Sequence, residues 1–200
     1  MVGGTTLADM RSVCVFCGSS SGSDARYLEA ASTLGAEIAR RGMTLVYGGA
    51  SVGLMGAVAD AALGEGGEVI GIIPEHLVAA EVAHDGLTDL RVTPSIHGRK
   101  AAMAEISDGF VAMPAGFGTL EEVVEILTWN QLGLITKPIG FLDTLGYYQR
   151  LGAFFGHCVS QEFVRAPHLG LYAMDSDPHA LLDAMEHYVP ATTPKWQDRT

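Results

Sequence analysis

The chain has 200 residues, which is enough for one domain with a substantial core. Hydrophobic residues make up 48% of the sequence and charged residues 18%, a balance that excludes a disordered chain. Acidic residues outnumber basic ones by 23 to 12, and the net charge of −11 argues against binding to a nucleic-acid backbone. A small anionic ligand stays compatible with this charge if backbone N–H groups and a local basic patch meet it.

The start of the chain, MVGGTTLADMRS, lacks the apolar run of a signal peptide. No stretch approaches the roughly 18 apolar residues of a membrane-spanning helix. We therefore expect a cytoplasmic protein without a membrane partner. We also expect a flexible N-terminus over 1–11, one folded domain over 12–190 and a flexible tail over 191–200.

Strands and helices are expected to alternate along the whole chain. In chain order they are a strand at 12–17, a helix at 24–41, a strand at 43–47, a helix at 54–63, a strand at 68–73, a short strand at 90–93, a helix at 96–107, a strand at 110–114, a helix at 119–132, the apolar segment 137–143, a helix at 146–160, a strand at 170–174 and a helix from Pro178. This alternation predicts an α/β fold with a parallel sheet covered by helices on both faces.

Three glycine-rich loops, GSSSG, GGASVG and PAGFG, each follow a predicted strand. The carboxyl ends of parallel strands share one edge of a sheet, and ligands of such sheets bind beyond that edge. We therefore expect these loops to form the site. None of them completes G-x-G-x-x-G, and the chain contains no P-loop sequence, which disfavours a dinucleotide oxidoreductase or a P-loop NTPase.

Cys14 and Cys17 form a C-x-x-C sequence, which raises the possibility of redox or metal chemistry. Both cysteines lie in the apolar run VCVFC, which is typical of a strand. Residues three apart on a strand face opposite sides of the sheet, so we expect two separate buried thiols. The seven histidines show no metal-ligand spacing, and no metal site is predicted.

The loop PAGFG leads into the helix expected from Thr119. The N-terminus of a helix presents unpaired N–H groups and the positive end of the helix dipole, both of which suit a phosphate. Thr119 and Glu122 also match T-x-x-E, a capping box in which Glu122 would only bond back to the helix start. The adjacent Glu121 leaves a second interpretation open, in which one carboxylate caps or binds while the other does chemistry.

Arg99 and Lys100 are adjacent cations in a strongly acidic chain. A solvated helix face is the usual place for such a pair. The functional alternative is contact with a phosphate or a leaving group, for which the planar guanidinium of arginine offers several donors.

The segment GRKAAMAEISDGFVAMPAGFGTLEEVVEILTW resembles the Lonely Guy family, the cytokinin-activating phosphoribohydrolases. The signature of this family is P-G-G-x-G-T-x-x-E preceded by an Arg-Lys pair. The resemblance extends to CGSSSG, YGGASVGLMGAVADAAL and GIIPEHL, and it covers roughly residues 12–145 with the blocks in the same order. It implies a single Rossmann-like α/β domain.

By this resemblance, Arg99 and Glu122 are the expected catalytic pair. The expected substrate-binding residues are Glu81, Lys100, Gly116, Phe117, Gly118, Thr119, Leu120, Glu121 and Thr128, to which we add Ser19 and Gly49 from the other glycine loops. The resemblance also implies a homodimer, to whose interface the surroundings of Trp129 would belong if they are not part of the core. Ala115 departs from the signature, which has glycine there; a positive φ would strain the alanine, whereas a negative φ would only narrow the approach to a phosphate.

The expected reaction is hydrolysis of the N-glycosidic bond of an adenosine 5′-monophosphate, N6-substituted or not, with release of free base and ribose 5-phosphate. It needs no cofactor. Two alternatives remain at this point: a non-catalytic carrier of a nucleotide or of molybdenum cofactor, and a broad nucleoside-monophosphate nucleosidase.

Overall fold

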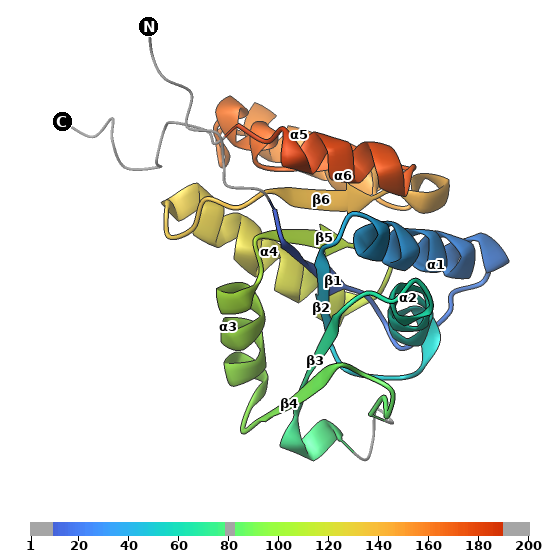
Figure 1. The fold of residues 1–200 in the computed structure, drawn as a ribbon. Helices are drawn as coiled ribbons and strands as arrows, with labels where there is room; N and C mark the ends of the chain where they lie inside the picture. Colours follow the sequence, from blue (N-terminus) through green and yellow to red (C-terminus); the bar gives the residue numbers. More distant parts are fainter. Residues whose placement is uncertain (1–9, 79–82, 190–200) are drawn as a thin grey trace, which may run out of the picture.

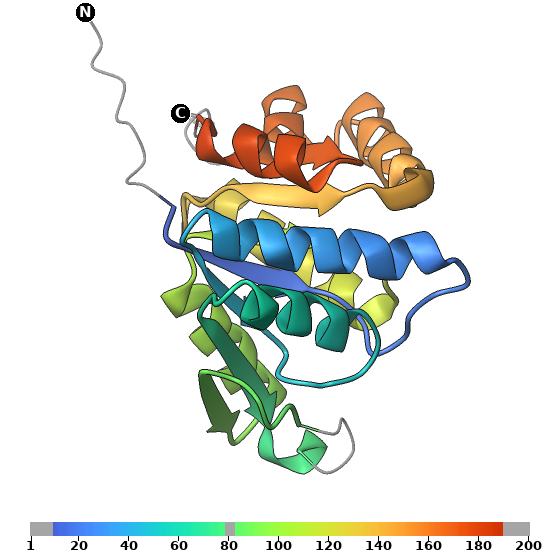
Figure 2. The ribbon, with the colours of Figure 1, turned by 45° about the vertical axis from the view of Figure 1, so that its right-hand side comes forward.

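The computed structural model describes residues 10–78 and 83–189. The elements, in chain order, are β1 Ser12–Phe16, α1 Ala25–Arg40, β2 Thr44–Tyr47, α2 Gly53–Gly64, β3 Val69–Pro74, the 3₁₀ turn η1 Glu75–Leu77, β4 Asp89–Thr93, α3 Ile96–Ile106, β5 Gly109–Ala112, α4 Phe117–Leu132, β6 Ile139–Leu142, η2 Thr144–Gly146, α5 Gln149–Ser160, η3 Ala166–Leu171, β7 Ala173–Asp175 and α6 Pro178–Glu186. Figures 1 and 2 show the helices packed against a central sheet.

The sheet has seven strands in the order β4-β3-β2-β1-β5-β6-β7, and every neighbouring pair is parallel. Strands β2, β3 and β4 extend the sheet in one direction from β1, and β5, β6 and β7 extend it in the other. The order therefore reverses between β1 and β5, where Val13 pairs with Gly109. Such a reversal opens a crevice at the carboxyl ends of the two strands, where ligands of open α/β sheets bind.

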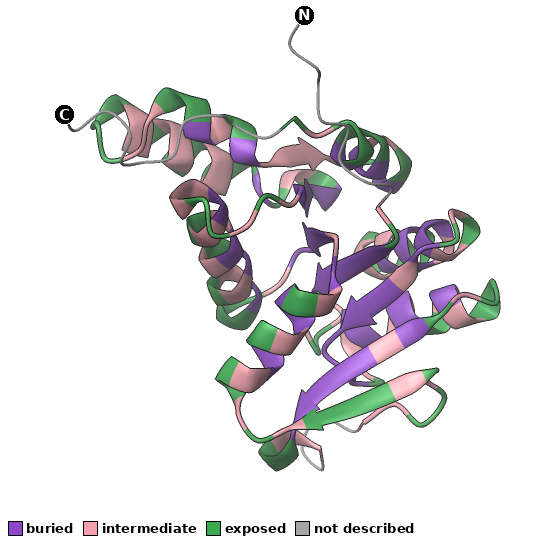
Figure 3. Ribbon diagram, turned by 60° about the vertical axis from the view of Figure 1, so that its left-hand side comes forward, coloured by how far each residue is buried: buried purple, intermediate pink, exposed green. Residues whose placement is uncertain are grey.

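Helices cover both faces of the sheet, as predicted. One buried cluster joins β1 to α1, α2 and α6, with Val15, Leu34 and Leu181 among its members. The other joins β1 to α3 and α4, with Met103 and Val123. Figure 3 shows the buried central strands and the exposed edge strand β4. The α/β Rossmann-like fold class is thus confirmed. The bounds of the single domain, 12–190, remain a prediction. Most of the residues predicted to form flexible termini lie outside the described residues.

Cys14, in β1, and Cys17, directly after it, lie on opposite faces of the sheet, as the strand periodicity predicts. Cys14 belongs to the buried cluster on the α3–α4 face, and Cys17 belongs to the cluster on the α1–α2 face. Both thiols are free, and burial is the main reason why their pKa values lie above the usual range. They are packing residues, and among the described residues no cluster of histidine, cysteine or acidic side chains suits a metal ion.

Several predicted boundaries are wrong: α5 begins at Gln149 and not at 146, and β5 ends at Ala112 and not at 114. The segment expected as a strand at 170–174 begins with the end of η3, and only Ala173–Asp175 forms β7. Helix α4 begins at Phe117, two residues before the predicted start. Other caps agree with the prediction: Ser95 Oγ accepts a hydrogen bond from Gly98 N, and Gly42 ends the turn after α1 with φ of 70°.

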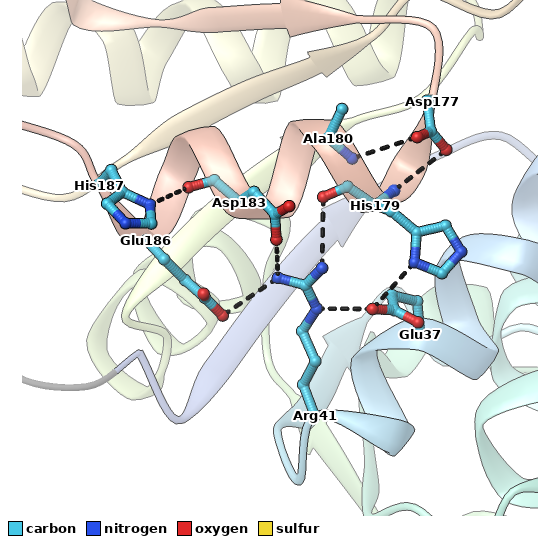
Figure 4. A network of polar contacts seen from close by, with 8 residues as sticks. All are labelled: Glu37, Arg41, Asp177, His179, Ala180, Asp183, Glu186 and His187. Atoms are coloured by element: carbon cyan, nitrogen blue, oxygen red, sulfur yellow. Dashed lines mark hydrogen bonds and ion pairs between the residues drawn. The ribbon is translucent and has the colours of Figure 1, made fainter.

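Helix α6 is held against α1 by a polar network around Arg41 (Figure 4). Its guanidinium lies 2.7 Å from Glu37 Oε1 and 2.7 Å from Asp183 Oδ1, and it also reaches Glu186. Burial alone would raise the pKa of Glu37, but hydrogen bonds from Arg41 and His179 lower it below the ordinary value of 4.5. The C-terminal part of the chain is therefore anchored by charge as well as by packing.

We predict that Arg41→Met lowers the free energy of unfolding by about 1–3 kcal/mol, because it removes the arginine donor from the Glu37 carboxylate, whose side chain is only 11% exposed. Arg26→Met is the matched control, since its ion pair with Asp24 is exposed and is expected to contribute about 0–1 kcal/mol. Urea denaturation of both variants measures the difference. Equal losses would show that the network adds nothing specific.

The same network predicts a pH dependence. The folded-state pKa of Glu37 is lowered, so its contribution is fully present above the unfolded value and is lost as the pH falls through the folded value. The difference in stability between wild type and Arg41→Met should therefore shrink below pH 4.5.

Candidate active site

The three glycine-rich loops meet at the carboxyl-terminal edge of the sheet, as predicted. Gly18, after β1, faces Ala115, after β5, so closely that a Cβ added to Gly18 would lie 3.3 Å from that of Ala115. Gly53 packs on the backbone of Ser19, where any side chain would overlap the Ser19 carbonyl, and its φ is 60°. The loops are thus fitted to one another at the point where the strand order reverses.

Helix α4 starts inside the loop PAGFG. Gly116 is the N-cap residue and makes no side-chain capping bond, so the N–H groups of the first turn stay available to a ligand. Thr119 is buried within that first turn and is not the cap, which shows that the capping-box interpretation of Thr119 and Glu122 is wrong. The positive end of the helix dipole points to the same place. This N-terminus is suited to an anion such as a phosphate.

Ala115 occupies the family's glycine position without strain. Among the described residues, only Leu145 and Glu162 are non-glycine residues with positive φ, so the φ of Ala115 is negative. Its methyl group points toward Gly18 and narrows the space between the loops. The alanine therefore causes no backbone strain at this position, and its effect is limited to narrowing the approach to a phosphate.

Arg99 and Glu122 come from different helices and converge on the end of β1. The guanidinium of Arg99 in α3 lies against Gly48, where a Cβ would overlap it, and the residue is only 9% exposed. Burial is the main cause that raises the pKa of the Cys17 thiol; the carboxylate of Glu122 raises it further and Arg99 lowers it. Both charged groups therefore act on Cys17, at the end of β1. A solvated helix face for Arg99 is excluded.

Lys100 is also buried, at 6% exposure, but its charge is already engaged. Its Nζ forms ion pairs with Glu121 and, at 2.9 Å, with Glu125. Burial tends to lower the pKa of Lys100, yet the two carboxylates raise it above its usual value. These pairs tie α3 to α4 and fix the relative position of Arg99 and Glu122.

A cavity of about 340 Å³ opens between the loops, a size typical of small-molecule sites. It is lined by Gly18, Ser19, Ser20, Gly22, Tyr27, Leu54, Pro114, Ala115, Gly116 and Tyr147. Of the candidate residues, Ser19 and Gly116 thus face it. Sequence reasoning missed Tyr27 and Tyr147, because each lies in or next to a helix with no motif around it.

A larger cavity, of about 600 Å³, lies at the opposite edge of the sheet, next to Met43 and Pro138. Two of the three cationic residues that line it are already paired: Arg41 with carboxylates of α1 and α6, and Lys137 with the carbonyl oxygens of Ala104 and Ser107. We assign the site to the smaller cavity, because it lies where α/β sheets bind ligands and beside the free turn of α4.

The remaining candidate residues that the structure describes do not line the 340 Å³ cavity. Thr128 is exposed near the far end of α4, where its hydroxyl donates to Val124 O, and it lines a separate small pocket with His168. Leu120 packs against the core, and Gly49, with φ of 82°, accepts a hydrogen bond from His84 N. Phe117 is 92% exposed at the rim. Glu81 lies outside the described residues.

Gly48→Ala tests the placement of Arg99. The added methyl group would overlap the end of the Arg99 side chain. Because that end can move, we expect a folded protein, with an activity of about one tenth of the wild-type value or less. Gly64→Ala is the control, because nothing lies within 4 Å of its Cβ position. Thermal unfolding and steady-state kinetics distinguish the two; an unchanged Gly48→Ala enzyme would remove Arg99 from the site.

Comparison with known proteins identifies the family. The family model "Possible lysine decarboxylase" matches residues 55–185. A probable cytokinin riboside 5′-monophosphate phosphoribohydrolase of rice, Oryza sativa subsp. japonica, is 48% identical over 95% of this chain and 84% of its own length. The cytokinin riboside 5′-monophosphate phosphoribohydrolase LOG1 of Arabidopsis thaliana is 41% identical over 89% of this chain and 84% of its own length. The chain belongs to this phosphoribohydrolase family.

Solved structures show the same fold in another functional setting. The molybdenum cofactor carrier protein of Chlamydomonas reinhardtii superposes with a TM-score of 0.69 at 25% identity, covering 90% of this chain and 98% of the carrier. The molybdenum cofactor binding protein of Rippkaea orientalis, at 22% identity and a TM-score of 0.64, adds evidence on the fold alone. No helix among the described residues is long and apolar enough to cross a membrane.

Proposed function

We propose that this chain hydrolyses the N-glycosidic bond of an adenosine 5′-monophosphate, N6-substituted or not, and that Arg99 and Glu122 carry the reaction. The observation that carries this proposal is that Arg99, buried against Gly48, and Glu122, in α4, both act on Cys17 at the end of β1, where the strand order reverses. Identity of 41–48% to phosphoribohydrolases over most of the chain supports the reaction.

Glu122 is the group suited to the reacting carbon. Cleavage of the bond between C1′ and N9 builds positive charge on the ribose, as in glycoside hydrolysis. A carboxylate beside C1′ stabilises that charge or activates the attacking water. Arg99 hydrogen-bonds either to the departing base or to the neighbouring ribose and phosphate, and burial restricts the motion of its side chain.

The 5′-phosphate binds, in this proposal, to the N–H groups of Gly116, Phe117 and Gly118. A phosphate held there fixes the ribose with respect to Glu122, which lies in the second turn of the same helix. The binding of a remote group thus orients the bond that is cleaved. Ser19 and Gly49 shape the loops around it, and Glu81 remains a proposed contact.

The proposal extends to a homodimer in the cytoplasm. Thr128 lies 12 residues beyond Gly116, which is about 18 Å along the helix axis, too far to touch a nucleotide at the N-terminus of its own α4. A second copy packed on the exposed face of α4, where Phe117 and Val124 are exposed, would bring another Thr128 to the site. In this arrangement Thr128 would bind the substrate of the other copy, in line with its predicted role in substrate binding.

The carrier remains the second candidate because the Chlamydomonas carrier shares the fold. Incubation of the purified protein with AMP and N6-isopentenyl-AMP, each beside its nucleoside, separates the two. Free base is followed by chromatography. Release from the monophosphates alone supports the hydrolase, and the ratio of the two rates separates a dedicated enzyme from a broad nucleosidase. No release from a folded protein would favour the carrier.

Glu122→Gln should fold normally and lose about 10²- to 10⁴-fold in kcat, because the amide neither stabilises a cation nor takes a proton. Glu105→Gln, an exposed change on the neighbouring helix α3, serves as the control and should retain wild-type rates. Full activity of Glu122→Gln in the same assay would contradict the assignment.

A further inference from the structure

Two consecutive tyrosines hold the loop between β5 and α4. Tyr148 Oη donates to Met113 O at 2.6 Å, and Tyr147 Oη donates to Ala115 O at 2.7 Å. Tyr148 is buried, whereas Tyr147 lines the cavity. The two phenols thus bind carbonyl groups two residues apart, directly before the helix whose N-terminus faces the proposed phosphate.

The hydrogen bond of Tyr147 also determines where a donor points. The described residues contain no cis peptide bonds, and in a planar trans peptide the C=O and the next N–H point in opposite directions. Fixing the Ala115 carbonyl toward Tyr147 therefore turns the N–H of Gly116 away from Tyr147. Gly116 is the N-cap of α4, so this group lies beside the free donors of the first turn.

Tyr147 contacts the opposite wall of the cavity as well. Its ring meets that of Tyr27 edge to face, with centroids 6.2 Å apart. The ring of Tyr27 in turn lies against Gly22, where a Cβ would be 2.7 Å from it and where φ is 76°. Tyr147 and Tyr27 together therefore connect the loop after β5 with the loop after β1, across the reversal of the strand order.

The turn that presents Tyr147 is strained. Leu145 has φ of 59°, a left-handed conformation that is unusual for a leucine, and Gly146 follows with φ of 72°. Tyr148 N donates to Asp143 Oδ1 at 2.6 Å, which closes the turn. Such conformations persist where surrounding contacts impose them, and they cluster at functional sites. Here the turn directs both phenols at the loop.

We infer that Tyr147 is a positioning residue for the substrate phosphate: it orients the Ala115–Gly116 peptide and holds the two loops at the proposed phosphate site. This inference rests on the proposed function. Tyr147 acts through the backbone that binds the phosphate, and it takes no part in cleaving the bond.

Tyr147→Phe removes only the hydroxyl. We expect KM for AMP, and the Kd for ribose 5-phosphate measured by calorimetry, to rise about 3- to 10-fold, the value of one hydrogen bond. The values of kcat and Tm should stay near those of wild type. Tyr172→Phe is the matched control, because Tyr172 packs with Phe141 and Phe155 away from the cavity and should leave all four quantities unchanged.

The outcomes distinguish a failure of the positioning role of Tyr147 from a failure of the proposed function. If wild type cleaves AMP and binds ribose 5-phosphate but Tyr147→Phe equals it in KM and Kd, the positioning role is overturned while the proposed function stands. A loss confined to kcat, or a fall in Tm that accounts for the weaker binding, also overturns it. If wild type neither cleaves nor binds the monophosphate, both proposals fail.

Discussion

The first turn of α4 is the constraint on which the site depends. Its free N–H groups need an anion or water, and the helix dipole favours an anion. The parallel sheet places this turn beside the end of β1, because the chain leaves β1 and β5 in opposite directions. Gly18 and Gly53 allow the neighbouring loops to approach closely enough to enclose it. The fold thus concentrates its free donors at one crevice.

Charge is distributed in a way that supports this site. The chain carries 12 basic residues against 23 acidic ones, yet two of the cations, Arg99 and Lys100, are buried next to it. Burial of a charge is costly unless it is paired. Lys100 is paired with Glu121 and Glu125, and this ion pairing locks α3 to α4. The charges of Arg99 and Glu122 both act on Cys17 at the end of β1.

Much of this arrangement could be predicted from the sequence. Alternating apolar periods predicted the α/β sheet, and glycine loops after the strands predicted its functional edge. The predicted start of α4 is wrong because Thr119 and Glu122 imitate a capping box, whereas the helix begins at Phe117 with Gly116 as its N-cap residue. The role of Tyr147 could not be predicted, since its hydroxyl meets Ala115, 32 residues away, through a strained turn. Tertiary contacts of this kind leave no local period in the sequence.

A crystal structure of the Glu122→Gln variant with bound AMP tests the central claim most directly. The account predicts the phosphate within hydrogen-bond distance of the N–H groups of Gly116, Phe117 and Gly118, with C1′ facing the side chain at position 122 and the guanidinium of Arg99 on the ribose, the phosphate or the base. A phosphate bound in the larger cavity at the opposite edge of the sheet, or a nucleotide whose C1′ lies away from position 122, would contradict it.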